Sequence, residues 1–369
     1  MMNWKQMALG AVGAISLLSI VACGGNTGTD GSMGSGTGGT DIVVKDNTNP
    51  SVYQSFKLEK IDKIANIRGV GWLTSDSILL DKPNKDLKPV TVEGEERYPH
   101  NIYVHDLVKG TDTLLKESDV SLAAPMASPD GQYVFYREPE ESVGKGFILN
   151  LNNGESVQTG KDMGFVGEGA WLDNTHVVYP NMEGNLVSAD VEGNTKVLVE
   201  VGSFNIRSVE VSGSTVYYIT GEDGQLNAYD AETGEVKQVL KSVEWVIPSN
   251  DGTGLAIVKK TADTKRALVI TDLEGNEKAT LARGTQIFGT SWSQDDSKIA
   301  YTINSESDNE KGLFVSNTES AEQFQISADM DNVSDPLAWS PEGSKILLSQ
   351  SVLDSAGYHF ETSIITISE

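Results

Sequence analysis

The stretch LAWSPEGSKILL at residues 337–348 has close counterparts in the same chain, TSWSQDDSKIAY at 290–301 and APMASPDGQYVF at 124–135. Each counterpart leads from an apolar segment through a polar turn into a second apolar segment. With one anchor residue taken at the end of the first segment, the chain contains seven such units. The anchors are Trp72, Met126, Trp171, Val209, Pro248, Trp292 and Trp339, at intervals of 38 to 54 residues. That period is typical of repeat architectures in which each unit is one module.

Each unit has the pattern of four short antiparallel strands. The turn after the anchor is rich in Ser, Pro, Asp and Gly, which suit tight hairpins. A β-rich run follows, such as KIAYT at 298–302, and then a third strand that ends at Asp or Asn before Gly, as in VITDLEG at 269–275. A fourth, alternating strand such as EVKQVL at 235–240 completes the unit. No segment has a convincing helical period, so we expect an all-β fold in which each unit is one propeller blade.

The two ends of the repeat region predict how the ring closes. The last unit is one strand short, because after its second strand the chain provides only TSIITIS at 362–368. The segment YQSFKLEKID at 53–62 has a strand pattern but no unit of its own. We expect 53–62 to pair with 362–368, which protects both edges. The result is a single propeller of seven four-stranded blades. Six or eight blades remain alternatives, because the units at Val209 and Pro248 match the pattern least well.

The Trp-Ser-Pro-Asp-Gly motif followed by an apolar strand resembles the WD40-like β-propeller repeat of TolB and related bacterial extracytoplasmic proteins. It is also similar to the propellers that precede prolyl-oligopeptidase-type hydrolases. The resemblance covers about residues 53–369 and is clearest at Met126, Trp292 and Trp339. It implies a propeller, but it does not imply the partners of TolB, which has an additional N-terminal α/β domain where this chain has a leader and a linker.

The first 25 residues, MMNWKQMALGAVGAISLLSIVACGG, have the composition of an export signal. Lys5 precedes an apolar run that is too short and too rich in Gly to favour a spanning helix. The run ends in Ile-Val-Ala-Cys at 20–23, which resembles the lipobox of bacterial lipoproteins. The resemblance implies cleavage before Cys23 and attachment of diacylglycerol and a further acyl group, such as palmitate, to Cys23. Several acyl chains on one residue give a firm anchor. The alternative is an ordinary secretory signal with an unrelated cysteine.

We therefore expect three segments. These are a lipoprotein signal peptide at 1–22, a lipid-anchored Cys23 with a flexible Gly/Ser/Thr-rich linker at 23–50, and the propeller at 51–369. The expected location is the cell envelope outside the cytoplasm: the outer membrane of a diderm cell, or the outer face of the cell membrane of a monoderm. The lipid anchor would make the membrane a partner, and we expect a monomer.

The charge of the chain excludes two classes of partner. It has 53 Asp and Glu residues against 28 Lys and Arg residues, a formal net charge of -25. Nucleic-acid binding needs clustered cations for the phosphate backbone, so we expect none. Electrostatic attachment to an anionic membrane surface is disfavoured for the same reason.

No catalytic motif stands out. A Gly-x-Ser-x-Gly elbow is absent, and His100, His105, His176 and His359 lie apart without zinc-site spacing. In DMDNVSD at 329–335, three carboxylates have the spacing of oxygen ligands but lack the Gly and terminal Glu of an EF-hand loop. We expect no cofactor and no metal, with Ca²⁺ as an alternative at Asp329, Asp331 and Asp335. We expect no enzymatic activity, with a propeller hydrolase or lyase as the alternative.

Loop lengths predict where a partner binds. The links between the second and third strands are long in units 1, 2, 6 and 7, at 81–101, 137–146, 304–312 and 350–361. These units are neighbours in a closed ring, so the links should form one sector of one face, where function usually lies. The longest link contains Arg97, Tyr98 and His100 among acidic residues, a composition that suits an interface. Residues just before the anchors are further binding candidates at the channel mouth: Arg68, Glu168, Arg207, Glu244 and Asp335.

Most of the repeated residues have a structural interpretation. We expect the anchor tryptophans to form inter-blade core rather than ligand platforms. The polar repeat residues should form turns: Asp106, Asp130, Gly131, Asp190, Asp230, Asp272, Asp296 and Gly343. The first functional interpretation is a non-catalytic binding scaffold for a protein or an envelope polymer. The alternatives are a small-molecule or glycan binder using the central channel, and the enzyme named above.

Overall fold

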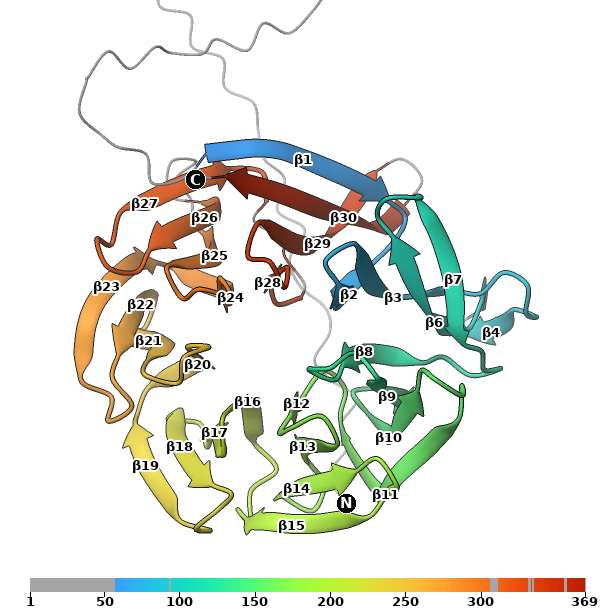
Figure 1. Cartoon of the computed structure of the whole chain (residues 1–369), viewed down its shortest axis with the longest axis horizontal. Coiled ribbons are helices and arrows are strands. Elements are labelled where there is room, and N and C mark those ends of the chain that lie inside the picture. Colours follow the sequence, from blue (N-terminus) through green and yellow to red (C-terminus); the bar gives the residue numbers. More distant parts are fainter. Residues whose placement is uncertain are drawn as a thin grey trace, which may run out of the picture. The chain divides into compact units, whose positions relative to one another are not determined.

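Seven four-stranded antiparallel sheets stand around a central axis in the computed structural model (Figure 1). The structure describes residues 57–368 apart from 93, 306–310, 331, 332, 334, 355 and 356, and every helix-or-strand element in these ranges is a strand. The predicted seven-bladed propeller is therefore confirmed. The predicted signal peptide, Cys23 and the linker lie outside the described residues.

In each blade the strands follow one another outward from the channel. Blade 1 contains β2 (Gly69–Thr74), β3 (Ser77–Pro83), β6 (His100–Asp106) and β7 (Thr111–Lys116). Blade 2 contains β8 (Ala123–Ala127), β9 (Tyr133–Glu140), β10 (Val143–Asn150) and β11 (Ser156–Phe165). Blade 3 contains β12 (Ala170–Trp171), β13 (His176–Pro180), β14 (Asn185–Asp190) and β15 (Thr195–Glu200). Blade 4 contains β16 (Ile206–Ser212), β17 (Thr215–Thr220), β18 (Gln225–Asp230) and β19 (Val236–Leu240).

The second half of the ring repeats this order. Blade 5 contains β20 (Val243–Pro248), β21 (Leu255–Ala262), β22 (Lys265–Thr271) and β23 (Glu277–Gly284). Blade 6 contains β24 (Gln286–Trp292), β25 (Lys298–Asn304), β26 (Gly312–Asn317) and β27 (Gln323–Ser327). Blade 7 contains β28 (Ala338–Trp339), β29 (Lys345–Asp354), β30 (Gly357–Ser368) and β1 (Lys57–Ala65).

Strand β1 closes the ring, as predicted. It pairs antiparallel with β30, from Lys57 opposite Ser368 to Ala65 opposite Glu361. The side chain of Lys63 forms an ion pair with Glu361 at 2.8 Å across the two strands. The first and last strands of the propeller thus share one sheet, and the outer edge of blade 7 is covered.

The anchor tryptophans link neighbouring blades. Each indole Nε1 donates a hydrogen bond to a carbonyl oxygen on the inner strand of the preceding blade, at 2.9–3.1 Å. The pairs are Trp72 with Ala338, Trp171 with Met126, Trp292 with Ile247, and Trp339 with Ser291. Three of the four indoles are only 8% exposed, and Trp72 is half-buried. The predicted inter-blade role is confirmed, and the hydrogen bond is an additional feature.

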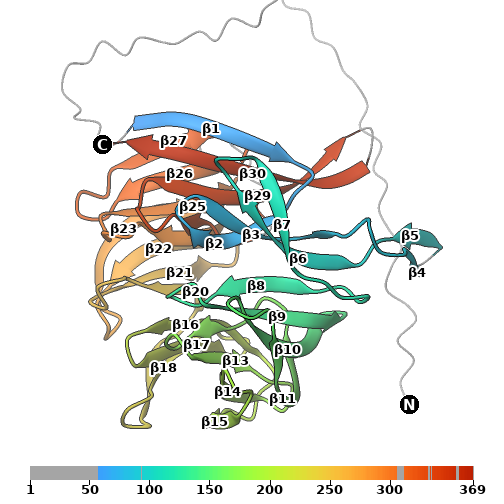
Figure 2. The same ribbon diagram turned by 45° about the vertical axis from the view of Figure 1, so that its right-hand side comes forward.

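Two predicted loops are β-hairpins. Strands β9 and β10 stay paired as far as Glu140 opposite Val143, and β29 and β30 as far as Asp354 opposite Gly357. The segments expected as links at 137–146 and 350–361 therefore continue the sheets over most of their length. The link at 81–101 contains a small hairpin of β4 (Val90–Val92) and β5 (Glu95–Arg97). These three hairpins, from the neighbouring blades 7, 1 and 2, extend toward the same side, and the β4–β5 hairpin projects furthest (Figure 2).

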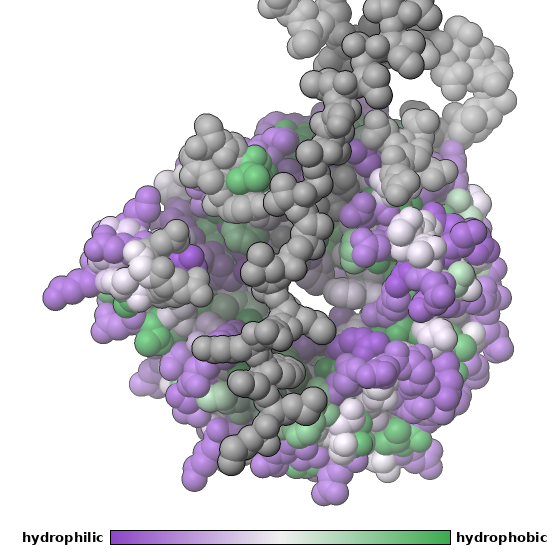
Figure 3. All heavy atoms as spheres, turned by 180° about the vertical axis from the view of Figure 1, so that it is seen from behind, coloured by the Kyte–Doolittle hydropathy of each residue, from purple (hydrophilic) through white to green (hydrophobic). Residues whose placement is uncertain are grey.

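On the face that Figure 3 shows, the coloured surface is mostly hydrophilic and is hollowed at the centre. Within the part of the chain that the structure describes, no helix is long and apolar enough to cross a membrane.

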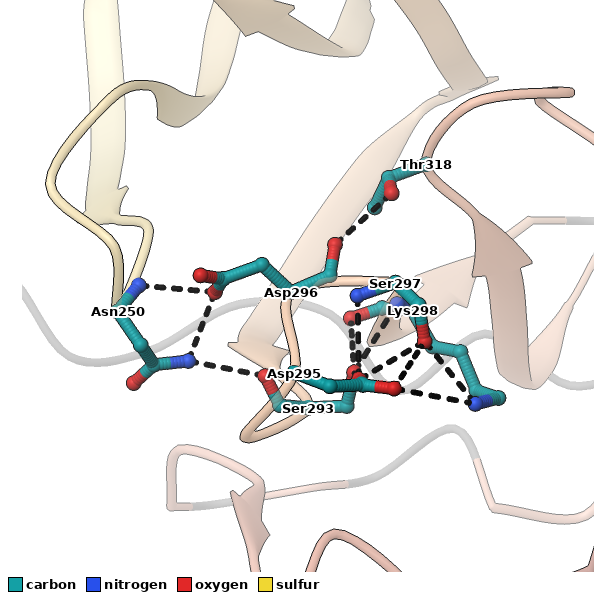
Figure 4. A network of polar contacts seen from close by, with 7 residues as sticks. All are labelled: Asn250, Ser293, Asp295, Asp296, Ser297, Lys298 and Thr318. Carbon is teal, nitrogen blue, oxygen red and sulfur yellow. Dashed lines mark hydrogen bonds and ion pairs between the residues drawn. The ribbon is translucent and has the colours of Figure 1, made fainter.

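The predicted turn residues form turns. The Oδ1 atoms of Asp106, Asp190, Asp230 and Asp272 each accept hydrogen bonds from two backbone N–H groups two to four residues ahead. Asp296 has a φ of 57°, and its carboxylate accepts from the backbone N–H of Asn250 and Asp251 at 2.8 Å (Figure 4). One turn residue of blade 6 therefore also holds the corresponding turn of blade 5.

Candidate functional site

A cavity of about 500 Å³ opens at the centre of the ring. Its wall is formed by the inner strands of blades 1, 2, 3 and 4, by Phe135 and Arg137 of β9, and by the segment before the inner strand of blade 7. The segments before β2, β12 and β28 belong to the blade-to-blade links, so the cavity reaches the channel mouth. That volume suits a small ligand or one segment of a polymer.

The inner strands β2, β8 and β16 are irregular where they line this cavity, as are β20 and β24, which do not line it. The pairing register shifts between Gly69 and Gly71 in β2, between Ala123 and Met126 in β8, and between Arg207 and Glu210 in β16. In β8 and β16 the bulges contain non-glycine residues with positive φ, Ala124 at 51° and Ser208 at 53°. Such conformations cost about 1–3 kcal/mol each, and bulges of this kind occur next to binding sites, where they direct backbone polar groups away from the ladder.

Arg68 and Asp335 form an ion pair at the mouth. Arg68 Nε and Nη2 donate to the two carboxylate oxygens of Asp335, at 2.8 and 2.5 Å. Arg68 Nη1 lies 3.6 Å from the buried carboxylate of Asp81, whose other oxygen lies 3.4 Å from His100 Nδ1. The contact with Asp335 is the main reason that the pKa of Arg68 is raised. Three predicted candidates, Arg68, His100 and Asp335, are thus brought into one network that joins blades 7 and 1.

Two carboxyl groups face the cavity from blades 3 and 4. Glu168 precedes β12, and one of its carboxylate oxygens accepts a long hydrogen bond of 3.5 Å from the backbone N–H of Val209. Glu210 is directed into the cavity from β16 and keeps some accessible surface there, although protein atoms surround it. Burial raises the pKa of Glu168, and burial together with the charge of Glu168 raises the pKa of Glu210 to about 8. At neutral pH Glu210 is therefore largely protonated and able to donate a hydrogen bond.

Arg137 is the most unusual group in the cavity wall. It is 1% exposed, and Nε, Nη1 and Nη2 have no hydrogen-bond partner among the described residues. Its guanidinium carbon lies 4.7 Å from the ring centroid of Phe135 and 4.5 Å from that of Tyr179. Burial lowers the pKa of Arg137 to about 10, so the group still carries its charge at neutral pH.

The other predicted candidates do not join this site. Glu244 is held by a bidentate contact with Arg266, at 2.8 Å for both hydrogen bonds. Arg207 donates to Asn205 Oδ1 at 2.9 Å and to the carbonyl of Gly221 at 3.1 Å, although its charge also acts on Glu168. Arg97 and Tyr98 are exposed where β5 ends, at the base of the β4–β5 hairpin, and neither lines the cavity.

The alternative Ca²⁺ site is not assembled from the residues that can be described. Asp329 is exposed, Asp331 lies outside the described residues, and Asp335 is engaged with Arg68. Within the described ranges, no three His, Cys, Asp or Glu side chains are grouped so that they could hold a metal ion. His105 contacts Asp112 at 2.6 Å and His176 contacts Asp173 at 2.9 Å, so both rings have a partner within their own blade.

Sequence reasoning missed Arg137, Glu210 and Ala124. Arg137 follows the apolar run YVFY at 133–136 and precedes acidic residues, so the sequence places it in the link at 137–146. Glu210 lies next to the anchor Val209 in one of the two weakest units. The bulge between Arg207 and Glu210 breaks the alternation of β16, so the sequence pattern does not show that Glu210 faces the cavity.

Comparisons with known proteins support the propeller fold. No family model and no curated protein matches this chain. Among solved structures, an oligogalacturonate lyase in complex with manganese aligns with a TM-score of 0.62 and 16% identity, over 84% of this chain and 91% of that one. The Cps50 (Swd1) propeller domain of Myceliophteria thermophila aligns with a TM-score of 0.58 and 11% identity, over 85% and 100%. TolB from Acinetobacter baumannii is a looser match, with a TM-score of 0.48 and 16% identity, over 69% and 64%.

Proposed function

We propose that this chain is a non-catalytic binding protein of the cell envelope, tethered through lipid on Cys23, that holds a segment of an envelope polymer in the cavity at the channel mouth. The cavity itself carries the proposal: it has the volume of a small-ligand site and contains strained bulges together with charged groups that have little contact with bulk water. The hairpins of blades 7, 1 and 2 would contact the polymer on either side of the bound segment. The protein would act as a monomer, and its function requires no cofactor.

A protein partner bound through the hairpins, as first predicted from loop lengths, would not need the cavity. A polymer segment does need it, because one or two monomer units fill about this volume whereas a folded partner would meet only the rim. The polar groups in the wall, among them Glu168, Glu210 and the Arg68–Asp335 pair, match a ligand with many hydroxyl or amide groups.

Filling the cavity tests this proposal. Gly71 lines it, and a Cβ added there would have no neighbour within 4 Å, so Gly71→Leu places a side chain in the cavity without a clash. Asp263→Leu is the matched control, since the side chain of Asp263 is 99% exposed in the turn between β21 and β22. We expect purified envelope polysaccharides to bind the full chain in biolayer interferometry, and Gly71→Leu, but not Asp263→Leu, to abolish binding. Equal binding by both variants contradicts the proposal.

A propeller hydrolase or lyase is the second candidate, favoured by the two carboxyl groups in the cavity. Glu168 and Glu210 have raised pKa values in a shared environment, an arrangement that also serves acid–base catalysis. The likeness to oligogalacturonate lyase concerns the fold. If the polysaccharides that bind are shortened on incubation, and if Glu210→Gln stops this while binding persists, the enzyme is the better description.

A further inference from the structure

We infer that the ligand of the cavity carries a carboxylate and that this group pairs with Arg137, an inference that rests on the proposed function because it names the chemistry of that ligand. A buried guanidinium is normally matched by an acid or by several carbonyl groups. Arg137 has five N–H donors and none of them is used by the described protein.

The residues around Arg137 leave space for its guanidinium group but provide no anion that pairs with it. The guanidinium lies against two glycines of the outer strands of blade 2. A Cβ on Gly146 would lie 2.9 Å from Nη1, and one on Gly164 would lie 2.6 Å from Nη2. The rings of Phe135 and Tyr179 provide favourable cation–π contacts, but a ring face offers no acceptor of the strength that a guanidinium finds in a carboxylate.

Nearby carboxylates of the chain are engaged or oriented elsewhere. Glu138 and Glu140 lie within 4 Å of Lys145 Nζ, and Asp162 contacts Asn181. Glu168 and Glu210, which line the same cavity, form no hydrogen bond or ion pair with Arg137. The wall of the cavity thus has an unpaired cation at blade 2 and carboxyl groups at blades 3 and 4.

This distribution of charge selects the class of anion. A planar guanidinium matches a planar carboxylate in two parallel hydrogen bonds. One guanidinium balances one negative charge, and the carboxyl groups across the cavity disfavour a doubly charged group such as phosphate. The body of the ligand beyond its carboxylate meets Glu168, Glu210 and the bulged backbone at Ala124, so it should carry hydrogen-bonding groups rather than further negative charge.

The test uses matched probes on the full chain. D-glucuronate and D-glucose differ at one carbon, which is a carboxylate in the first and a hydroxymethyl group in the second. We expect D-glucuronate and acetate to raise the Tm of the wild-type protein and to bind in calorimetry, and D-glucose to do neither. Equal effects of D-glucuronate and D-glucose, or stronger binding of inorganic phosphate than of D-glucuronate, overturn the inference.

Two variants separate this role from a purely structural one. Arg137→Met keeps the length of the side chain and removes its charge. It should abolish the response to D-glucuronate without lowering the Tm of the free protein, because an unpaired buried cation is lost. A lower Tm with unchanged D-glucuronate binding shows a structural cation and overturns the inference.

If Arg137→Met does not fold, Arg137→Lys replaces it. Arg137→Lys keeps the charge but not the planar fork, so it should weaken D-glucuronate binding about tenfold; unchanged affinity overturns the inference.

The outcomes also distinguish the two proposals. Polysaccharide binding that is lost in Gly71→Leu but kept in Arg137→Met leaves the proposed function intact and overturns the carboxylate. D-glucuronate binding that depends on Arg137, without any polysaccharide binding that depends on Gly71, supports the carboxylate site and contradicts the polymer.

Discussion

The hydrogen bond between the indole of one blade and the backbone of the preceding blade should be a measurable part of the stability of this propeller. Trp292→Phe tests it at the boundary between blades 5 and 6. The indole of Trp292 is 8% exposed, and its Nε1 donates to the carbonyl oxygen of Ile247 at 3.0 Å. Phenylalanine keeps an aromatic ring in the same apolar cluster but removes the donor.

Two contributions make up the expected decrease in the free energy of unfolding. Leaving the carbonyl of Ile247 without its donor costs about 1–3 kcal/mol. The smaller ring of phenylalanine loses the apolar contacts of two carbon atoms, about 1.6 kcal/mol. We therefore expect Trp292→Phe to lower the free energy of unfolding by about 3–5 kcal/mol, measured by urea denaturation followed by circular dichroism.

Trp245→Phe is the matched control. Trp245 packs against the same cluster from β20, but its buried Nε1 has no hydrogen-bond partner among the described residues. The substitution removes the same atoms, and the loss of ring contacts is offset because an unsatisfied donor disappears. We expect a change within about 1 kcal/mol of zero. Equal losses in Trp292→Phe and Trp245→Phe would refute the reasoning, because the cost would then come from ring size and not from the hydrogen bond.

Three further predictions concern the wall of the cavity. Arg68→Met leaves the nearly buried carboxylates of Asp81 and Asp335 without their cation. It should lower the free energy of unfolding, measured in urea, by about 2 kcal/mol. A loss below about 0.5 kcal/mol would mean that the ion pair is solvated like a pair on the surface. Ala124→Gly relieves a φ of 51° and should raise the Tm and add about 1 kcal/mol of stability; a lower Tm would mean that the Ala124 methyl group is needed for packing. Burial raises the pKa of Glu210 from 4.5 to about 8, so between these pH values the folded protein binds a proton that the unfolded chain releases. The free energy of unfolding should therefore fall as pH rises through this window, and Glu210→Gln should flatten this part of the profile, which a series of urea titrations at different pH values would show.

The repeat could be predicted because each of its signals is local. A hairpin turn, an apolar strand and an Asp or Asn before Gly all lie within one unit, so their spacing is visible along the chain. Closure by β1 followed from counting strands, since the last unit was one short. The lengths of the hairpins were harder to predict from the sequence. The segment REPEESVGKG at 137–146 is polar enough to indicate a loop, yet it continues β9 and β10 because the sheet extends beyond the body of the ring.

The candidate site could be predicted only in part, because its ion pairs join distant positions. Arg68 and Asp335 are 267 residues apart and meet only after the ring has closed. Both line the cavity, but the sequence cannot show that each satisfies the other. The burial of Arg137 could not be predicted because it depends on small residues in other strands. Its burial depends on Gly146 and Gly164 in the next two strands, and a glycine that makes room for a side chain looks the same in sequence as a glycine in a turn.

Among the described residues, the cavity, the extended hairpins and the two strained residues of the inner strands lie on blades 7, 1, 2, 3 and 4. The cavity is lined by blades 7, 1, 2, 3 and 4, and neither β20 nor β24 contributes to it. The extended hairpins belong to blades 7, 1 and 2, and the non-glycine positive-φ residues of the inner strands, Ala124 and Ser208, belong to blades 2 and 4. Neutral insertions and tolerated strain have no reason to favour the same part of the ring, since every blade offers equivalent loops and inner strands. Their overlap around one cavity is better explained by a ligand that enters at the mouth beside the hairpins and reaches blade 2, where the charge of Arg137 is still without a partner among the described residues.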